Sequence, residues 1–195
     1  DAGKSSFYTQ ASGLPELKHA VVDYFKTFYG YAITPNEVVV TAGAKFALYA
    51  LFASVLNSGD EVIIPTPYWV SYADQIKMVG GVPVFAVGSQ ASDFKVTVSQ
   101  LNELKTDKTR VLVLNSPSNP TGMIYTAEEL TEIGNWAVDN DVLILADDIY
   151  GRLVYNGNEF TPISTLSDAI RNQTIIINGV SKTYAMTGWR IGFAV

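Results

Sequence analysis

The sequence contains no cysteine among its 195 residues and only one histidine, His19. Without cysteine it has no disulfide framework and no Cys-ligated zinc site. Nothing in the composition therefore requires an oxidising compartment, and we expect the protein in the cytoplasm. The single histidine lies in a segment of helical periodicity and is expected to be exposed, which disfavours a Ser-His-Asp hydrolase.

Positive charge is also scarce. Thirteen Lys and Arg face 19 Asp and Glu, which gives a formal net charge of −6 at pH 7. This sign opposes binding to the phosphate backbone of nucleic acids and to anionic membrane surfaces. Although 48% of the residues are hydrophobic, no apolar run approaches the roughly 18 residues of a membrane-spanning helix. The apolar side chains are therefore expected to form the core of one folded domain.

Seven short runs rich in β-branched residues alternate with segments of helical periodicity. Runs such as 111–114 and 142–145 are apolar on both faces, which is typical of parallel strands covered by helices on both sides. The sequence therefore predicts a doubly wound, three-layer α/β/α domain with a seven-stranded, mostly parallel sheet. The expected strands are 38–41, 61–64, 82–87, 111–115, 142–146, 174–178 and 191–195, and the expected helices are 14–28, 44–56, 69–78, 98–104 and 127–138.

Ligands of an open parallel sheet bind beyond the carboxyl ends of its strands, so the residues that follow each strand are the first site candidates. After the first strand, Gly43, Ala44 and Lys45 enter a helix whose free backbone N–H groups suit a phosphate. Small residues at such a turn also occur for packing alone. After the second strand, Trp69 can either stack on a flat ring or cover the core.

Polar residues also follow two later strands. The loop 116–122 carries Asn119, whose amide can donate to a ring oxygen, although most Asn-Pro loops are turns. The fifth strand ends in Asp147 and Asp148, which strand alternation places on opposite faces. A covered carboxylate needs a partner, and a structural arginine, a metal and a protonated ring nitrogen all qualify. No further carboxylate stands at the neighbouring strand ends to complete a magnesium site.

The segment after the sixth strand holds Lys182 among small and apolar residues, with Arg190 eight residues later. Desolvation lowers the pKa of a lysine and makes its amine a nucleophile, whereas an ordinary loop lysine is a solvated charge. Pyridoxal phosphate would use every candidate, since it needs a phosphate site, an aromatic stacker, an amide donor, an acid for its ring nitrogen and a lysine for its aldehyde. No G-x-G-x-x-G follows the first strand, which disfavours a nicotinamide cofactor.

Three segments, SPSNPTG (116–122), DDIY (147–150) and SKTYAMTGWRIG (181–192), resemble the class I and II pyridoxal-phosphate aminotransferases of fold type I, nearest to their prokaryotic aspartate aminotransferase branch. The resemblance covers essentially all 195 residues. It implies a transaminase that moves an amino group from an L-amino acid such as aspartate to a 2-oxo acid. It also implies that Lys182 forms the aldimine with the cofactor and then moves the proton.

The resemblance implies a role for each other candidate as well. Asp147 keeps the pyridine nitrogen protonated, and Asn119 and Tyr150 bond the ring oxygen. Trp69 stacks on the ring and, with Asn119, borders the substrate. A homodimer with shared sites is implied, because one phosphate ligand comes from the neighbouring subunit. The residues implied to hold the phosphate are Gly43, Ala44, Lys45, Arg190 and Tyr8 of the neighbouring subunit.

The sequence departs from the family pattern in two places. Many relatives carry Ser or Thr three residues before the lysine as a phosphate ligand; Gly179 stands there, which leaves Ser181 as the nearer hydroxyl. The family binds the substrate α-carboxylate with an arginine from a small C-terminal domain, and neither that domain nor the family's N-terminal segment is among these residues. We therefore expect residues 1–195 to be the cofactor-binding large domain, which alone binds pyridoxal phosphate with little turnover.

Two other functions are compatible with the same residues. A β-eliminating C–S lyase uses the same scaffold and releases pyruvate and ammonia without an amino acceptor. A non-catalytic aminotransferase-like domain would sense a ligand for a transcription regulator or would only dimerise. The intact Lys182 and Asp147 argue against lost catalysis, and Trp69 favours the aspartate-type branch.

Overall fold

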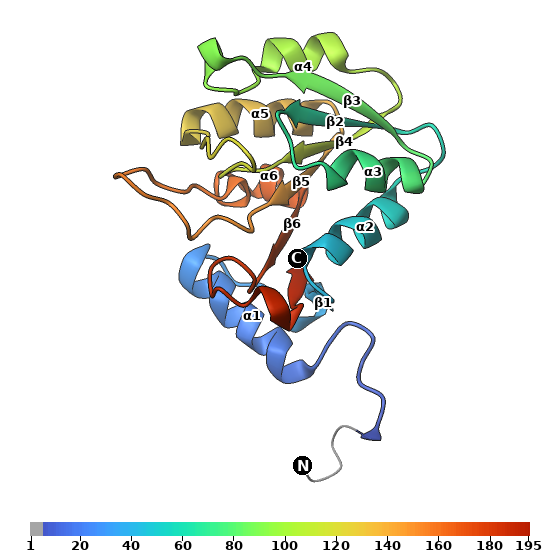
Figure 1. Cartoon of the computed structure of the whole chain (residues 1–195), viewed down its shortest axis with the longest axis vertical. Coiled ribbons are helices and arrows are strands. Elements are labelled where there is room, and N and C mark those ends of the chain that lie inside the picture. Colours follow the sequence, from blue (N-terminus) through green and yellow to red (C-terminus); the bar gives the residue numbers. More distant parts are fainter. Residues whose placement is uncertain (1–5) are drawn as a thin grey trace.

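The β-branched runs of the chain form one seven-stranded sheet in the computed structural model, which describes residues 6–195 (Figure 1). The strand order is β1-β7-β6-β5-β4-β2-β3. Neighbouring strands are parallel except at β7, which is antiparallel to both β1 and β6. The predicted seven-stranded, mostly parallel sheet is therefore confirmed. The strands are β1 (Val39–Thr41), β2 (Glu61–Thr66), β3 (Val82–Val87), β4 (Thr109–Leu114), β5 (Leu143–Asp147), β6 (Thr174–Gly179) and β7 (Gly192–Ala194).

Helices cover both faces of this sheet, as the apolar strands require (Figure 1). The five expected helices are present within two residues of their expected ends, and a sixth, α6, was not predicted. The α-helices are α1 (Pro15–Phe28), α2 (Ala44–Val55), α3 (Ser71–Met78), α4 (Val98–Leu104), α5 (Ala127–Asp139) and α6 (Asp168–Asn172), and the short 3-10 helices are η2 (Pro35–Glu37), η3 (Gln90–Ser92), η4 (Ile163–Thr165) and η5 (Thr187–Trp189).

The core consists of two apolar clusters separated by the sheet. In β4, Val111 and Val113 face the cluster under α2 and α3, whereas Leu112 and Leu114 face the cluster under α1, α4, α5 and α6. Successive residues of a strand point to opposite faces, so a strand buried on both sides carries no polar alternation. The same alternation decides which side chains of β5 and β6 lie on the same side of the sheet.

Strand β2 continues beyond its expected end at Ile64 and includes Pro65. Proline lacks the N–H that a strand donates to its neighbour. Here β4 pairs with β2 only as far as Ile63, so Pro65 has a single neighbouring strand, β3, and the missing donor disrupts no second ladder. Helix α3 begins at Ser71, which leaves Trp69 in the connecting segment rather than in the helix.

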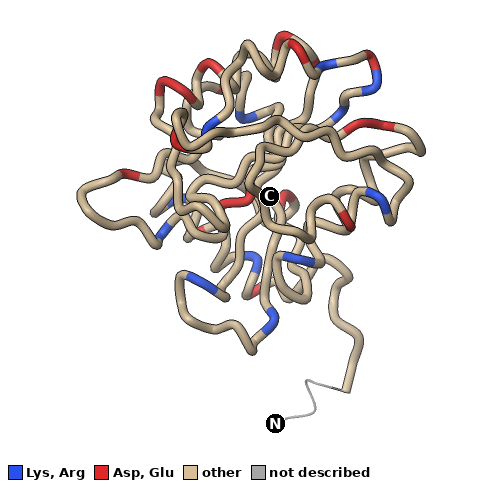
Figure 2. Tube along the Cα trace, turned by 45° about the horizontal axis from the view of Figure 1, so that its top comes forward, with Lys and Arg blue, Asp and Glu red and all other residues tan. Residues whose placement is uncertain are grey.

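The charged residues are spread over the trace, with Asp and Glu interspersed among Lys and Arg (Figure 2). No single basic face stands out in this view. Within residues 6–195, no helix is long and apolar enough to cross a membrane.

Phe25 anchors α1 to the sheet, and its replacement tests the core beneath that helix. Its ring is fully buried and stacks on Tyr29 with 4.2 Å between the ring centroids. We expect Phe25→Ala to lower the free energy of unfolding by about 3–5 kcal/mol in chemical denaturation, because a buried ring leaves a cavity. The control Tyr155→Ala, at an exposed loop residue, should change it by less than about 0.5 kcal/mol. Equal effects of the two variants would contradict the core assignment.

Candidate active site

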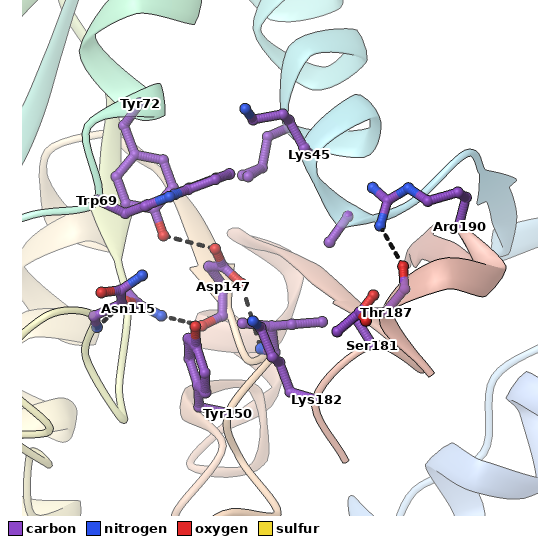
Figure 3. Close-up of a pocket in the computed structure, with 14 residues that line it drawn as sticks. Lys45, Trp69, Tyr72, Asn115, Asp147, Tyr150, Ser181, Lys182, Thr187 and Arg190 are labelled. Carbon is purple, nitrogen blue, oxygen red and sulfur yellow. Dashed lines mark hydrogen bonds between the residues drawn. The ribbon is translucent and has the colours of Figure 1, made fainter. Parts of the chain in front are cut away.

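A cavity of about 340 Å³ lies beyond the carboxyl ends of β4, β5 and β6, beside the start of α2 (Figure 3). Its position agrees with the rule for ligands of open parallel sheets. Of the ten residues that the sequence suggested for catalysis or cofactor binding, eight line this cavity. The lining residues are Ala44, Lys45, Leu48, Trp69, Tyr72, Asn115, Asn119, Asp147, Ile149, Tyr150, Ser181, Lys182, Thr187 and Arg190.

The acid of this cavity is Asp147, the last residue of β5. Its side chain lies on the α2 and α3 face of the sheet and is only 3% exposed. One carboxylate oxygen accepts a 2.6 Å hydrogen bond from the Tyr72 hydroxyl, and the other accepts a 3.3 Å bond from the Ile149 N–H. Burial raises the pKa of Asp147 to about 6, and these two hydrogen bonds oppose the rise. Among residues 6–195, no cationic side chain lies within 4.0 Å of this carboxylate.

Asn115 links the acid to the proline-rich loop that follows β4. Its side-chain N–H donates to the Asp147 carbonyl at 2.8 Å, and its side-chain oxygen accepts the Asn119 N–H at 2.8 Å (Figure 3). The Asn115 side chain therefore holds the backbone of two candidate residues, Asn119 in the loop after β4 and Asp147 at the end of β5. Asn119 is half-buried in the cavity lining.

Three cationic side chains line the same cavity: Lys45, Lys182 and Arg190. Within the described part of the chain, no carboxylate lies within 4.0 Å of any of them. Lys182 is half-buried, with its ammonium nitrogen 5.5 Å from the centroid of the Tyr150 ring. Arg190 donates one hydrogen bond, of 2.9 Å, to the Thr187 carbonyl. The cavity therefore carries an excess of positive charge, which suits an anionic ligand.

The start of α2 adds backbone donors to this positive wall. Gly43 precedes the helix with φ +86° and gives it no side-chain cap, so the first N–H groups of the helix point outward. A Cβ on Gly43 would overlap the Arg190 guanidinium, and a Cβ on Gly192 would overlap Ala44. Glycine at both positions lets β7, Arg190 and the helix start approach one another closely.

Aromatic rings close the other side of the cavity. Trp69 and Tyr72 meet edge to face, with 5.5 Å between centroids and planes at 88°. The Lys45 ammonium lies 5.2 Å from the centroid of the Trp69 ring. Trp69 is half-buried, so part of its ring is accessible.

The structure explains the departure from the family pattern at Gly179. A Cβ at this position would stand 2.7 Å from the Ile191 carbonyl oxygen and 3.0 Å from the Gly192 Cα. A serine or threonine side chain does not fit there while β6 and β7 keep this spacing. Ser181 lines the cavity, which makes it the hydroxyl available near Lys182.

Two candidate residues do not line the cavity, and five lining residues were not expected. Gly43 is buried behind Arg190, and Tyr8 is fully exposed on the segment that precedes α1. His19 is exposed on α1. Asn115 directly precedes the motif 116–122, Ile149 and Thr187 lie inside the motifs 147–150 and 181–192, and the three-residue spacing from Trp69 was the only signal for Tyr72. The unexpected lining residues are Leu48, Tyr72, Asn115, Ile149 and Thr187.

Asp148 lies on the opposite face of the sheet from Asp147, as strand alternation predicted. It is buried and accepts a 2.8 Å hydrogen bond from the Tyr29 hydroxyl, which in turn accepts a 3.3 Å bond from the Asn178 side chain. Burial, with a smaller contribution from the neighbouring Asp147, raises the pKa of Asp148 to about 8. Asp148 therefore does not line the cavity.

The donor set of the cavity fits pyridoxal phosphate. A buried carboxylate without a cationic partner, at Asp147, is stabilised by a protonated ring nitrogen. The uncapped start of α2 with Arg190 suits a phosphate, and the Lys182 amine suits an aldehyde. A phosphorylated cofactor with a cationic ring would thus supply the oppositely charged partners that Asp147 and the cations of the cavity do not find among residues 6–195.

A parallel α/β sheet with a lysine, an unpaired buried acid and an uncapped helix start at its strand ends defines a class of cofactor-dependent α/β enzyme folds. The chain belongs to the class I and II aminotransferase family, whose family model matches residues 1–195. It is 67% identical over 193 residues to the asparagine–oxo-acid transaminase of Streptococcus mutans serotype c. It is 52% identical over 187 residues to an aspartate aminotransferase of Bacillus sp. strain YM-2.

These relatives are longer than the chain. The two matches cover 99% and 96% of it, but only 49% and 48% of the relatives, so the chain spans about half the length of the curated relatives it matches. The crystal structure of the aspartate aminotransferase from Rhizobium meliloti superposes with a TM-score of 0.93 at 42% identity, covering 96% of this chain and 47% of that one. The family resemblance seen in the sequence and the fold class are both confirmed.

The buried Asp148 makes stability depend on pH. Its folded-state pKa of about 8 exceeds the usual value of about 3.9, so between these values the folded protein binds more protons than the unfolded chain. Stability therefore falls as pH rises, by up to about 1.4 kcal/mol per pH unit. Asn at this position cannot titrate and still accepts the Tyr29 hydrogen bond. We expect Asp148→Asn to flatten the fall of the thermal unfolding midpoint between about pH 5 and pH 8.

The exposed Asp107 supplies a control, because Asp107→Asn removes one carboxyl without changing a buried group. That variant should keep the slope of the unaltered protein. An unchanged slope in Asp148→Asn would show that Asp148 is ionised in the folded state at neutral pH.

Proposed function

We propose that the protein is a pyridoxal-phosphate-dependent transaminase that moves an amino group from an L-amino acid of the aspartate type to a 2-oxo acid. The observation that carries this proposal is that Lys182, an amine, and Asp147, a buried carboxylate, line the same cavity without pairing with each other. Among residues 6–195, no cationic side chain lies within 4.0 Å of Asp147, and no carboxylate lies within 4.0 Å of the cationic side chains of the cavity.

Each side chain at the ring end of the cavity has a distinct task. Pyridoxal phosphate, when bound, supplies an aldehyde that reacts with amines and a ring that withdraws electrons from the amine-bearing carbon. Asp147 would hold a proton on the ring nitrogen, and Asn119 and Tyr150 would donate to the ring oxygen. Trp69 would stack on the ring face. The amine of Lys182 would hold the cofactor by its aldehyde, and the Lys182 Nζ would hold and move the proton that the reaction transfers.

The phosphate end uses backbone donors and one guanidinium. The N–H groups of Ala44 and Lys45, freed by Gly43, point out of α2. Arg190 supplies charge beside them, and Ser181 supplies a hydroxyl. Helix starts bind phosphate through this combination of N–H groups and the helix dipole.

The substrate proposal rests on the relatives' names and on one side chain. The two relatives described above are named as transaminases of asparagine and of aspartate. The Lys45 ammonium lies over Trp69 inside the cavity, without an acidic partner within 4.0 Å among residues 6–195. A carboxylate or amide oxygen on the donor's side chain would meet it. We propose aspartate and asparagine as the first amino donors to assay, with 2-oxo acids as acceptors and Trp69 and Asn119 beside the substrate.

The domain and partner proposals follow from the family. Residues 1–195 act as the cofactor-binding large domain, which alone binds the cofactor with little turnover, and the protein works in the cytoplasm as a homodimer. Tyr8 and Phe7 are exposed ahead of α1, where they are free to contact a second subunit. Exposed apolar residues Phe46 and Met78, on α2 and α3, offer further surface near the cavity. Tyr8 would then reach the phosphate of the neighbouring site.

The first test removes the lysine. We expect Lys182→Ala in the full-length protein to lower transamination by about 100-fold or more. Borohydride treatment of the unaltered protein with pyridoxal phosphate should attach the cofactor to the peptide that contains Lys182, as read by mass spectrometry. Lys77→Ala, at an exposed residue of α3, is the control and should retain both properties. Cofactor attachment at another lysine would refute the assignment.

The products separate the proposal from its alternatives. Release of pyruvate and ammonia without an amino acceptor would favour the C–S lyase. Cofactor binding by the full-length protein without turnover of any amino donor would favour the non-catalytic sensor.

The second test asks whether two subunits share a site. If Tyr8 serves the neighbouring phosphate, Tyr8→Ala should weaken cofactor binding by about 10-fold, the loss of one hydrogen bond to a charged group. Lys182→Ala and Tyr8→Ala chains mixed during refolding form hybrid dimers in which one of the two sites is unaltered. We expect transamination at saturating substrate and limiting cofactor to rise above the mean of the separate variants. No rise, with hybrids shown by native mass spectrometry, would contradict shared sites.

A further inference from the structure

Two adjacent carboxyls of this protein each accept a hydrogen bond from a buried tyrosine. The Tyr72 hydroxyl of α3 donates to Asp147 at 2.6 Å, and the Tyr29 hydroxyl of α1 donates to Asp148 at 2.8 Å. All four side chains are buried. The two pairs lie on opposite faces of the sheet, and only the first lines the cavity. A buried tyrosine–aspartate hydrogen bond is thus present once inside the candidate site and once outside it.

We propose that Tyr72 is a positioning residue for the cofactor acid: its hydroxyl orients the Asp147 carboxylate toward the ring nitrogen and favours its ionised form, while its ring edge holds Trp69 in the stacking position. This inference deepens the proposed function and rests on it. The motifs of the sequence do not include Tyr72, which reaches the site from a helix between two of them.

Hydrogen bonds hold Asp147 at three points, two on its carboxylate and one on its backbone. Tyr72 holds one carboxylate oxygen, the Ile149 N–H holds the other, and Asn115 holds the carbonyl of the same residue. The Tyr72 bond is the shortest of the three (Figure 3). Among residues 6–195, the Tyr72 hydroxyl is also the only donor to the Asp147 oxygen that it contacts. Loss of this hydroxyl would leave that oxygen without a donor among residues 6–195 and the carboxylate held only by the longer bond from the Ile149 N–H.

A neutral donor suits this position better than a cation. Burial raises the pKa of Tyr72 well above its usual value, and the charge of Asp147 adds to the rise, so the phenol keeps its proton and acts as the donor. Its hydrogen bond lowers the pKa of Asp147 and opposes the effect of burial. A lysine or arginine in its place would neutralise the carboxylate and remove the attraction for a cationic ring. Tyrosine orients the charge without cancelling it.

Other titratable groups face the same carboxylate and remain in place when Tyr72 is changed. From α2 the cavity receives Lys45, from the segment after β5 it receives Tyr150, and from the segment after β6 it receives Lys182 and Arg190. Asp148 is the adjacent residue on the other face. Since all of these are common to the unaltered protein and to each variant, a difference in pH dependence reports the Tyr72 hydroxyl.

The competing explanation is structural: Tyr72 would only anchor α3 to the sheet. Tyr29 anchors α1 in this way, with the same kind of acceptor one residue further along the chain. Tyr29→Phe is therefore a matched control, because it deletes one buried hydroxyl from one carboxyl and touches no lining residue of the cavity.

The experiment compares Tyr72→Phe, Tyr29→Phe and the unaltered full-length protein. The dissociation constant of pyridoxal phosphate is measured by equilibrium dialysis between about pH 5 and pH 9, and the thermal unfolding midpoint is measured beside it. Affinity should fall as pH drops, because a protonated Asp147 no longer attracts the ring nitrogen. We expect Tyr72→Phe to weaken binding by about 10-fold at pH 7 and to move the acid-side midpoint up by about one pH unit.

Tyr29→Phe should lower the unfolding midpoint while leaving the dissociation constant and the acid-side midpoint within about two-fold of the unaltered values. Equal effects of the two tyrosine variants on cofactor binding would overturn this inference and leave the proposed function standing. Failure of the unaltered protein to bind pyridoxal phosphate at any pH would overturn both.

A second variant covers the case in which Tyr72→Phe does not fold. Tyr72→difluorotyrosine keeps the shape of the side chain and makes its hydroxyl a stronger donor. The stronger hydrogen bond should move the acid-side midpoint of cofactor binding down, opposite to the phenylalanine variant. An unmoved midpoint would overturn the inference.

Discussion

The site depends on a carboxylate that is buried without a cationic partner among residues 6–195. Asp147 ends a strand that is apolar on both faces, and its only donors within the described chain are a hydroxyl and a backbone N–H. Burial of an unpaired carboxylate costs several kcal/mol in an apolar environment. The raised pKa of Asp147, to about 6, expresses this cost. In the proposed function, a ligand with a cationic ring would recover this cost on binding.

The positive side of the cavity depends on close backbone approach. Strand β7 runs antiparallel between β1 and β6, and Gly192 at its start packs against the first residue of α2. Gly43 has no room for a Cβ beside Arg190. Two glycines far apart in the sequence therefore bring a helix start and a guanidinium to one place. Asp147 and the three cationic side chains line one cavity without an ion pair between them among residues 6–195, which suits a ligand that carries charges of both signs.

The sequence by itself determined the sheet, its seven strands and five of the six α-helices. Apolar runs such as Val111–Leu114 are dictated by burial on both faces, and burial is a local property of each strand. Motifs after the strands predicted most of the lining, because carboxyl ends of parallel strands meet at one edge. Their proposed roles await experiment. Helix α6 was not predicted, since its five residues are too few for a helical period.

Only the tertiary structure decided what holds the Asp147 carboxyl and why it, rather than its neighbour, faces the cavity. Strand alternation places Asp147 and Asp148 on opposite faces without saying which face carries the ligand, and the family resemblance alone singled out Asp147. The fold settles this by covering one face with α2 and α3 and the other with α1. Tyr72 and Tyr29 reach their acceptors across 75 and 119 residues of chain. Such contacts follow from helix packing over the sheet, which no local spacing encodes.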